Sequence, residues 1–209
     1  MEFRDVSFAY DSTPVLKAVS FIAHPHGTAL VGPSGAGKST VAMLAARFWD
    51  IQEGEILVGG VPVKEISIPV LMDNVAFVFQ DNTLFFDTIE ENIRMGNQEA
   101  TFEEVTRAAE AAQCHTFIEA LPDGYQTLVG EGGTYLSGGE AQRIALARAI
   151  LKDAPIILLD EATAFADPEN EGKILDAFSH LTKGKTVLVI AHRLVQSPMP
   201  TASCTWIKE

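Results

Sequence analysis

The fold of this chain is decided by one stretch, Gly32-Pro33-Ser34-Gly35-Ala36-Gly37-Lys38-Ser39-Thr40. The stretch fits the pattern G-x-x-x-x-G-K-[S/T] at every position. An apolar run typical of a short buried strand precedes it at 28–31, and a helical pattern follows it at 41–48. Glycines let the backbone turn tightly and aim several N–H groups at one point, and a helix N-terminus adds partial positive charge. The sequence therefore predicts a phosphate-binding loop that holds a nucleoside triphosphate.

Two side chains of the predicted loop have separate tasks. Lys38 carries the charge that meets the β- and γ-phosphates, and the hydroxyl of Ser39 is a ligand for Mg²⁺. The alternative is a Gly- and Ser-rich turn that matches the pattern by chance. The strand before the loop and the helix after it favour the phosphate-binding interpretation.

Length and composition exclude several classes of protein. With 209 residues, 47% hydrophobic and 21% charged, the chain is an ordinary globular protein with room for a sizeable core. Its net charge of −13 argues against a nucleic-acid-binding surface. Cys114 and Cys204 have no metal-ligand spacing, which favours a reducing compartment. No apolar run approaches the roughly 20 residues of a membrane span. Because charges begin at Glu2, we expect no signal peptide.

Hydrophobic patterning predicts strands and helices on either side of the loop. Residues 1–21 alternate apolar and polar side chains, which favours two antiparallel strands, and 55–63 reads as a hairpin about a Gly-Gly turn. The pattern becomes helical from about 84 to 120, where Thr101 and Glu104 have the spacing of a capping box.

Other apolar runs are continuous, which is typical of parallel strands covered on both faces. Besides 28–31, they are 75–79, 156–159 and 186–191. Each of the four is followed by polar residues suited to phosphate chemistry, namely the loop, Gln80, the pair Asp160-Glu161, and His192. Ligands of open α/β sheets bind at the carboxyl ends of the strands. The sequence therefore predicts that these four segments point at one edge of a sheet.

The residues at these strand ends suit the hydrolysis of a nucleoside triphosphate. Asp160 can hold Mg²⁺ through water, and Glu161 can orient and deprotonate the attacking water. His192 would stabilise charge on the γ-phosphate, and Gln80 would touch the metal or the water. The alternatives are a solvated carboxylate pair, an ordinary histidine and a loop glutamine; the strand-end positions favour the catalytic interpretation.

The motif Leu136-Ser137-Gly138-Gly139-Glu140, which we call the signature, resembles together with the motifs above the nucleotide-binding domain of ATP-binding-cassette (ABC) proteins, and the resemblance covers nearly the whole chain. It implies that Ser137, Gly138, Gly139 and Glu140 point at the γ-phosphate bound by a second subunit. The family more often has Gln where Glu140 stands. The same residues also form a helix N-cap with a capping box, and both interpretations can hold because such an N-terminus is an anion site.

The resemblance implies an α/β fold of the P-loop NTPase type. Its RecA-like, mostly parallel sheet core carries an antiparallel β subdomain and an inserted α-helical subdomain. We expect a single domain over 1–209. Its core and β subdomain would occupy 1–79 and 156–194, its helical subdomain 84–152, and an atypical tail 195–209.

Further matches refine the resemblance. Tyr10 stands where the family places an aromatic residue that stacks on adenine, although a core aromatic is a serious alternative. Asp167 matches the loop that crosses the dimer interface. The segments 127–133 and 84–93 resemble exporter-type transporters, in which the second segment meets coupling helices of the membrane domain. The surroundings at 164–171 resemble exporter-fold transporters linked to siderophores, some of which import, so the direction of transport stays open.

The tail departs from the family, which continues after His192 with a pattern like Asp-Ala-Asp-x-Ile-x-x-Leu-Asp-x-Gly. In a frame displaced by one base, permitted codons for 195–209 spell Asp-Ala-Asp-Cys-Ile-Val-Tyr-Leu-Asp-Gln-Gly. We therefore hypothesise that the residues after about Leu194 come from a frameshift, natural or introduced, and that closing strands of the fold are missing. A divergent disordered terminus is the alternative. The coding DNA distinguishes the two.

The resemblance implies that the chain binds and hydrolyses ATP with Mg²⁺ and dimerises on ATP to power an exporter-type ABC transporter. Its partners would be a second nucleotide-binding domain, identical or different, and a transmembrane domain, with no nucleic acid. It would lie at the cytoplasmic face of the cell (inner) membrane. The alternatives are a cassette that only dimerises with nucleotide or is inactive in truncated form, and a non-transport ABC ATPase of DNA repair or translation. A small-molecule kinase shares the loop, but the signature has no role there.

Overall fold

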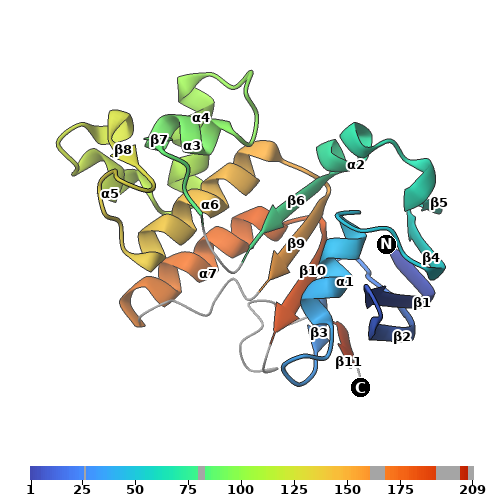
Figure 1. The fold of residues 1–209 in the computed structure, drawn as a ribbon. Coiled ribbons are helices and arrows are strands. Elements are labelled where there is room, and N and C mark those ends of the chain that lie inside the picture. Colours follow the sequence, from blue (N-terminus) through green and yellow to red (C-terminus); the bar gives the residue numbers. More distant parts are fainter. Residues whose placement is uncertain (26, 80–82, 161–167, 192–202, 207–209) are drawn as a thin grey trace. The chain divides into compact units, whose positions relative to one another are not determined.

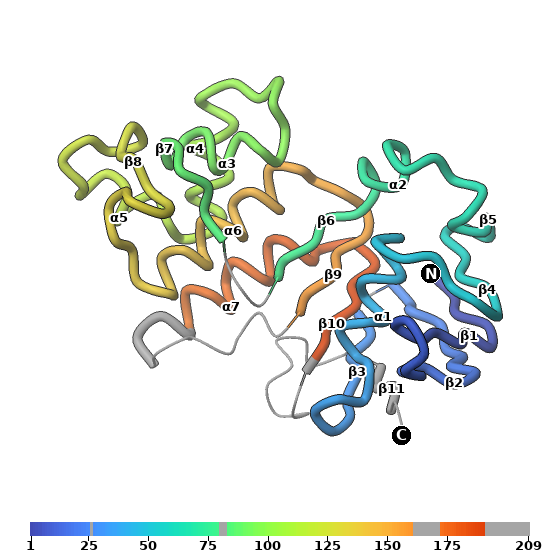
Figure 2. The backbone as a smooth tube through the Cα atoms, viewed as in Figure 1, coloured from blue at the N-terminus to red at the C-terminus, as the bar shows by residue number. Residues whose placement is uncertain are grey.

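The structure is a computed structural model that describes residues 1–209 except 26, 80–82, 161–167, 192–202 and 207–209 (Figure 1). The chain divides into two compact units. Unit 1 comprises Met1–Phe77, Pro155–Glu161 and Gly184–Glu209, and unit 2 comprises Val78–Ala154 and Ala162–Lys183. Figure 2 follows the backbone through both units.

Unit 1 holds two sheets and the helix that follows the phosphate loop. Its elements are β1 (Glu2–Tyr10), β2 (Thr13–Ile22), β3 (Thr28–Val31), α1 (Lys38–Ala45), β4 (Glu53–Val58), β5 (Val61–Pro62), the 3₁₀ helix η1 (Val63–Glu65), α2 (Ile68–Asn74), β6 (Val75–Val78, of which the last residue belongs to unit 2), β9 (Ile156–Asp160), β10 (Thr186–Ala191) and β11 (Ser203–Trp206). The first sheet has the order β2-β1-β4-β5, and its pairs are antiparallel. The two antiparallel strands expected at 1–21 and the hairpin expected at 55–63 are thus confirmed.

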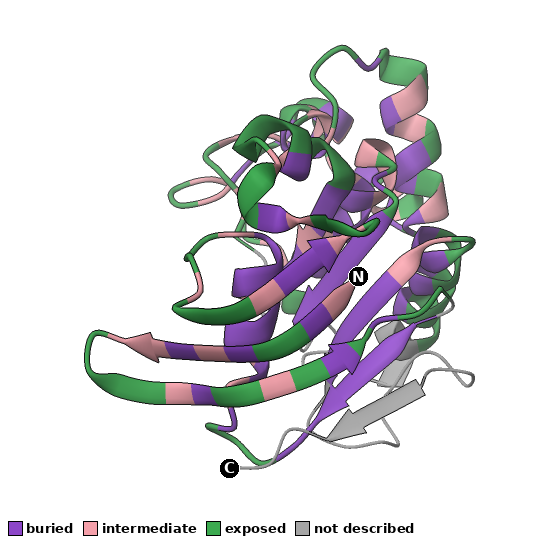
Figure 3. Ribbon diagram, turned by 90° about the vertical axis from the view of Figure 1, so that its right-hand side faces the viewer, coloured by how far each residue is buried: buried purple, intermediate pink, exposed green. Residues whose placement is uncertain are grey.

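The second sheet has the order β11-β3-β10-β9-β6. Strand β10 pairs in parallel with β3 on one side and with β9 on the other. All described residues of β3 and β9 are buried, and Figure 3 shows both strands in the colour of buried residues. The runs 28–31, 156–159 and 186–191 are therefore parallel strands covered on both faces, as predicted. The run 75–79 supplies β6, which lies next to β9, and the α/β class with a mostly parallel core sheet is confirmed.

A single apolar cluster joins the two sheets and α1 within unit 1. It includes Phe3 of β1, Leu30 of β3, Val41 of α1 and Leu158 of β9, each at most 1% exposed. The rings of Phe3 and Phe21 stack with their centroids 4.5 Å apart. Helix α1 packs against β9 and β10. This shared core fixes the position of the loop between β3 and α1.

Strand β11 lies at the edge of the second sheet. Its backbone pairs in parallel with β3, with Ser203 opposite Thr28 and Trp206 opposite Val31. The edge of the sheet at β3 is therefore covered by a strand from the tail. The expectation that closing strands are missing does not hold for the strand at this position. The other residues of the tail, 195–202 and 207–209, lie outside the described residues, and the frameshift stays a hypothesis.

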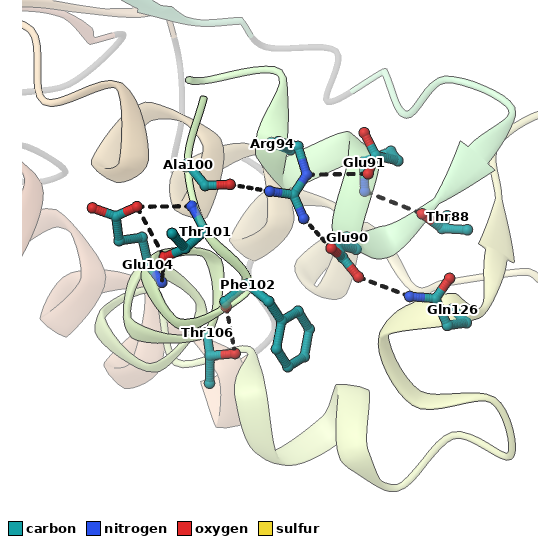
Figure 4. A network of polar contacts seen from close by, with 10 residues as sticks. All are labelled: Thr88, Glu90, Glu91, Arg94, Ala100, Thr101, Phe102, Glu104, Thr106 and Gln126. Atoms are coloured by element: carbon teal, nitrogen blue, oxygen red, sulfur yellow. Dashed lines mark hydrogen bonds and ion pairs between the residues drawn. The ribbon is translucent and has the colours of Figure 1, made fainter. Parts of the chain in front are cut away.

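Unit 2 is mainly helical. Its elements are β7 (Asp87–Thr88), α3 (Ile89–Arg94), α4 (Phe102–Ala111), α5 (His115–Glu119), the 3₁₀ helix η2 (Gly124–Gln126), β8 (Leu128–Val129), α6 (Gly138–Lys152) and α7 (Pro168–Thr182). Helix α6 packs against α3, α4 and α7. The predicted capping box at the start of α4 is present, because Glu104 N donates to Thr101 Oγ1 and Thr101 N donates to Glu104 Oε2 (Figure 4).

The place of helix α7 and the burial of Cys114 both bear on the expectations from the sequence. Helix α7 groups with unit 2, whereas its residues fall within the segment 156–194 that we assigned to the core. Cys114 is fully buried, and burial raises the pKa of its thiol to about 12, so this cysteine behaves as a packing residue. Among the helices of the described residues, none combines the length and apolarity of a membrane span.

Candidate functional site

The segment Gly32–Thr40 leaves the end of β3 and enters α1 at Lys38, in the strand-loop-helix context that the sequence predicts. Its middle residues Pro33, Ser34 and Gly35 are exposed, whereas Thr40 is buried. Gly35 and Gly37 have φ of +85° and +80°, a backbone conformation that costs an L-residue about 1–2 kcal/mol. The glycines are therefore required by the path of the loop.

Gly37 is also required by its surroundings. A Cβ atom at Gly37 would lie 2.7 Å from Leu16 Cδ2 and 3.0 Å from Val15 Cγ1, while a Cβ at Gly35 would meet nothing within 4 Å. Leu16 is 2% exposed, so its side chain would have to shift within a packed core. The close approach of β2 thus singles out one of the two glycines.

We expect Gly37→Ala to reduce the free energy of unfolding clearly more than Gly35→Ala. At both positions the positive φ destabilises an alanine by about 1–2 kcal/mol. Gly37→Ala alone also places a methyl group against a packed core, which typically lowers the free energy of unfolding by about 1–3 kcal/mol more. Urea unfolding of the two variants measures the difference, with Gly35→Ala as the matched control. Equal losses would mean that Val15 and Leu16 yield to the added methyl group.

Lys38 lies inside the loop. Its Nζ donates to the backbone oxygens of Gly32 at 3.0 Å and Pro33 at 2.8 Å. The residue is only 5% exposed. A buried ammonium is stable only where oxygen acceptors surround it. The loop therefore holds a fixed positive charge at its centre, as binding of a triphosphate requires.

Ser39 and Asp160 meet although 121 residues separate them in sequence. Ser39 Oγ donates to Asp160 Oδ1 at 3.1 Å, and Asp160, the last residue of β9, is 6% exposed. A hydroxyl and a carboxylate side by side next to a phosphate loop are the kind of oxygen donors that Mg²⁺ takes. These two residues thus fit a magnesium ion.

Tyr10 lies close to the helix that follows the loop. Its hydroxyl is 3.5 Å from Thr40 Oγ1 and 3.8 Å from Met43 Sδ. Its ring meets Phe8 and Trp49 edge-on, with centroids 4.8 and 5.4 Å away. Tyr10 is therefore near the loop and also packed among aromatic residues, so both interpretations of this residue are compatible with its position.

The signature residues begin helix α6 in unit 2. Ser137 Oγ accepts from Glu140 N at 3.3 Å, and Ser137 N donates to Glu140 Oε2 at 2.8 Å. Ser137 and Gly138 are exposed, while Gly139 is buried. The predicted capping box is present, and the cap residue Ser137 and the first helical residue Gly138 are open to solvent.

The two exporter-like segments, 84–93 and 127–133, lie side by side within unit 2. Strand β7 pairs with β8, with Asp87 opposite Val129, and Ile89 N donates to Thr127 O at 3.0 Å. The segments carry three exposed apolar side chains, those of Phe85, Phe86 and Leu128. We call these three the apolar patch.

Four predicted site residues, Gln80, Glu161, Asp167 and His192, lie outside the described residues. The described backbone ends next to three of them, because β9 ends at Asp160, β10 ends at Ala191, and Phe79 precedes Gln80. Strands β3, β10 and β9 are neighbours and parallel, so their carboxyl ends lie at one edge of the sheet, as predicted.

The structure draws attention to two residues, Trp49 and Gln142, that the sequence did not indicate. Trp49 follows α1 and contacts Tyr10, and the aromatic pair Phe48-Trp49 was the only signal. Gln142 of α6 is fully buried, and its carboxamide has no hydrogen-bond partner among the residues that the structure describes. Nothing in the sequence pattern distinguishes Gln142 from a surface glutamine.

Comparisons with known proteins find the same family throughout. A family model described as "ABC transporter" matches residues 16–164. The "ATP-dependent lipid A-core flippase" of Syntrophus aciditrophicus is 48% identical over 195 residues, 93% of this chain and 32% of the flippase. The "Heavy metal tolerance protein" of Schizosaccharomyces pombe is 49% identical over 194 residues, 92% of this chain and 23% of that protein.

A solved structure described as a bacterial Atm1-family ABC exporter with ATP bound superposes with a TM-score of 0.91 at 41% identity. It covers 99% of this chain, which in turn spans 36% of that exporter chain. The chain thus corresponds to about a third or less of the length of these proteins.

Proposed function

The chain belongs to the ABC transporter family, and from that premise we propose that it hydrolyses ATP to power transport by an exporter-type transporter. Relatives with exporter and flippase in their names favour this function over a non-transport ABC ATPase. The observation that carries the proposal is the contact of Ser39 with Asp160 beside the buried ammonium of Lys38. These three groups supply the charge and the oxygen ligands that phosphoryl transfer needs.

The proposed mechanism assigns one task to each residue. Mg²⁺ would be held by Ser39, Asp160 and Gln80, and when bound it neutralises charge on the phosphates. Lys38 binds the β- and γ-phosphates. Glu161 accepts a proton from the attacking water, and His192 donates a hydrogen bond to the γ-phosphate as negative charge develops.

We propose further that the complete site forms between two copies of the domain. The start of α6, where Ser137 and Gly138 are exposed, would offer the positive end of a helix dipole to the γ-phosphate bound by the partner. Asp167 would cross the interface, and Tyr10 would stack on adenine. Hydrolysis then separates the pair, since the γ-phosphate that joins the two copies is lost.

The membrane domain is the second proposed partner. The apolar patch of Phe85, Phe86 and Leu128 would receive its coupling helices, and the chain would then lie at the cytoplasmic face of the inner membrane. Names such as flippase and exporter favour outward transport. The relatives named for lipid A-core and for heavy metals share this domain, so we assign the choice of substrate to the membrane domain; the siderophore link stays a prediction.

The proposal is tested by phosphate release from MgATP as a function of protein concentration. We expect a steeper than linear dependence that approaches second order at low concentration, because two chains must meet to complete a site. A linear dependence would mean that one chain suffices. ATP binding without phosphate release at any concentration would instead identify a cassette that only dimerises.

A further inference from the structure

The backbone beneath the apolar patch is held by one buried side chain. Asn92 of α3 is fully buried. Phe85 N donates to its Oδ1 at 2.9 Å, and its Nδ2 donates to Phe85 O and Thr88 O, each at 3.0 Å. The carboxamide therefore pairs with both polar backbone groups of Phe85, much as a neighbouring strand would. Phe85, which is 53% exposed, therefore has its backbone fixed by buried hydrogen bonds.

Arg148 of α6 donates two hydrogen bonds to the same asparagine. Its Nε donates to Asn92 O at 2.8 Å and its Nη2 to Asn92 Oδ1 at 3.2 Å. The guanidinium also lies over the ring of Phe85, 5.7 Å from the ring centre. Burial lowers the pKa of Arg148, and hydrogen bonds from a charged donor that is partly shielded from water are among the stronger ones.

A third constraint comes from the segment that leads toward the signature. Gly130 has φ of +89°, and a Cβ there would lie 2.6 Å from the carbonyl carbon of Phe85 and 2.7 Å from Phe86 N. The peptide that joins Phe85 and Phe86 is therefore packed directly on the backbone of Gly130. The patch has little freedom to move by itself.

Helix α6 connects this cluster to the signature. Arg148 lies in its last turns and Ser137 caps its start. A continuous hydrogen-bonded helix is a stiff element, so a displacement at Arg148 reaches the other end. We propose that Asn92 and Arg148 are positioning residues that make the apolar patch and helix α6 move as one body. Through them, docking of the membrane domain on Phe85 and Phe86 sets the position of the signature residues, an inference that rests on the proposed function.

Helix α3 offers a matched control that leaves this cluster intact. Arg94, two residues after Asn92, contacts the carboxylates of Glu90 and Glu91 and the backbone oxygen of Ala100 (Figure 4). Glu90 in turn accepts from Gln126 Nε2 at 2.7 Å. None of the contacts drawn in Figure 4 involves Phe85 or Asn92. Arg94→Ala therefore removes several polar contacts of α3 and leaves the hydrogen bonds of Asn92 with Phe85 and Arg148 in place.

The test compares ATP hydrolysis by the isolated chain with that by the full-length transporter to which the proposed function assigns it. The full-length protein is placed in vesicles of phosphatidylethanolamine and phosphatidylglycerol, and the readout is the ratio of the two turnover numbers. Asn92→Asp keeps the size of the side chain and its acceptor oxygens, but it cannot donate to Phe85 O and Thr88 O. We expect the isolated chain to keep its KM for ATP and its turnover within about twofold.

With Asn92→Asp, the ratio of full-length to isolated-chain turnover should move about tenfold toward one. Coupling between sites commonly has effects of this size. Arg94→Ala should leave the ratio unchanged, even where it lowers the melting temperature. If Asn92→Asp does not fold, Arg148→Lys serves the same purpose, because lysine keeps the charge but lacks the planar fork.

The outcomes separate the two proposals. A ratio that is unchanged in a folded Asn92→Asp or Arg148→Lys protein overturns the linkage, and so does a ratio of one in the unsubstituted protein. An equal change in Arg94→Ala also overturns it, since loosening of α3 alone would then suffice. Failure of the isolated chain and of the full-length protein to hydrolyse ATP would instead refute the proposed function.

Discussion

Replacing Glu161 with Gln is expected to stop ATP turnover almost completely while ATP binding persists. The substitution keeps the shape of the side chain and removes its ability to accept a proton. A positioned general base contributes about 10²–10⁴-fold to the rate, so we expect turnover to fall by about that factor. Glu161 directly follows Asp160, whose carboxylate contacts Ser39 of the phosphate loop, so the base is proposed to lie beside the metal.

The experiment measures phosphate release and binding of a fluorescent ATP analogue on the same protein. Because hydrolysis is proposed to separate the paired domains, the Glu161→Gln protein should also accumulate as a dimer with ATP, which gel filtration detects. Glu99→Gln, the same chemical change at an exposed position of unit 2, should alter neither property. Unchanged turnover in a Glu161→Gln protein that still dimerises would refute the role of Glu161 as the base.

Lys38→Met should weaken the binding of MgATP about 100-fold. Methionine keeps the apolar stem and removes the ammonium that Gly32 O and Pro33 O hold inside the loop. Hydrogen bonds to charged groups contribute about 1.5–3 kcal/mol each, and about 1.4 kcal/mol corresponds to a tenfold change in affinity. Contacts of Lys38 with two phosphates therefore account for a loss of this size.

Isothermal titration calorimetry with MgATP measures the affinity. Lys64→Met, at an exposed position of unit 1, is the control and should bind as the unsubstituted chain does. Lys38→Met should also unfold at lower urea, because the carbonyls of Gly32 and Pro33 lose their donor. An unchanged affinity would mean that Lys38 serves only to hold the empty loop together.

The local features of this chain could be predicted from sequence because short-range chemistry determines them. The capping boxes at Thr101 and Ser137 depend on residues three positions apart, and the structure contains both. The strand-loop-helix context of Gly32–Thr40 follows from glycine spacing and from the apolar residues on either side. The buried strands β3, β9 and β10 were visible as continuous apolar runs.

The features that the sequence left unpredicted all depend on contacts between distant segments. The pairing of β11 with β3 joins residues about 175 positions apart, and no pattern in the tail indicated it. The edge-on packing of Tyr10 with Trp49 depends on how the residues that follow α1 pack on β1. The contacts of Asn92 and Arg148 with Phe85 were not predicted either. In sequence, a buried asparagine of a short helix cannot be distinguished from an exposed one.

The sequence by itself determined which groups are available: a phosphate loop, a signature helix and a pair of carboxylates at the end of one strand, each defined by residues a few positions apart. Only the tertiary structure decided which of them meet. Ser39 reaches Asp160 because β10 pairs in parallel with both β3 and β9 and so brings the ends of those strands to one edge. Arg148 reaches Asn92 because α6 packs against α3. Burial of apolar surface drives such packing, and this force does not depend on the orientation of the groups that it buries. The partner of each polar group is therefore determined only when the whole core is assembled.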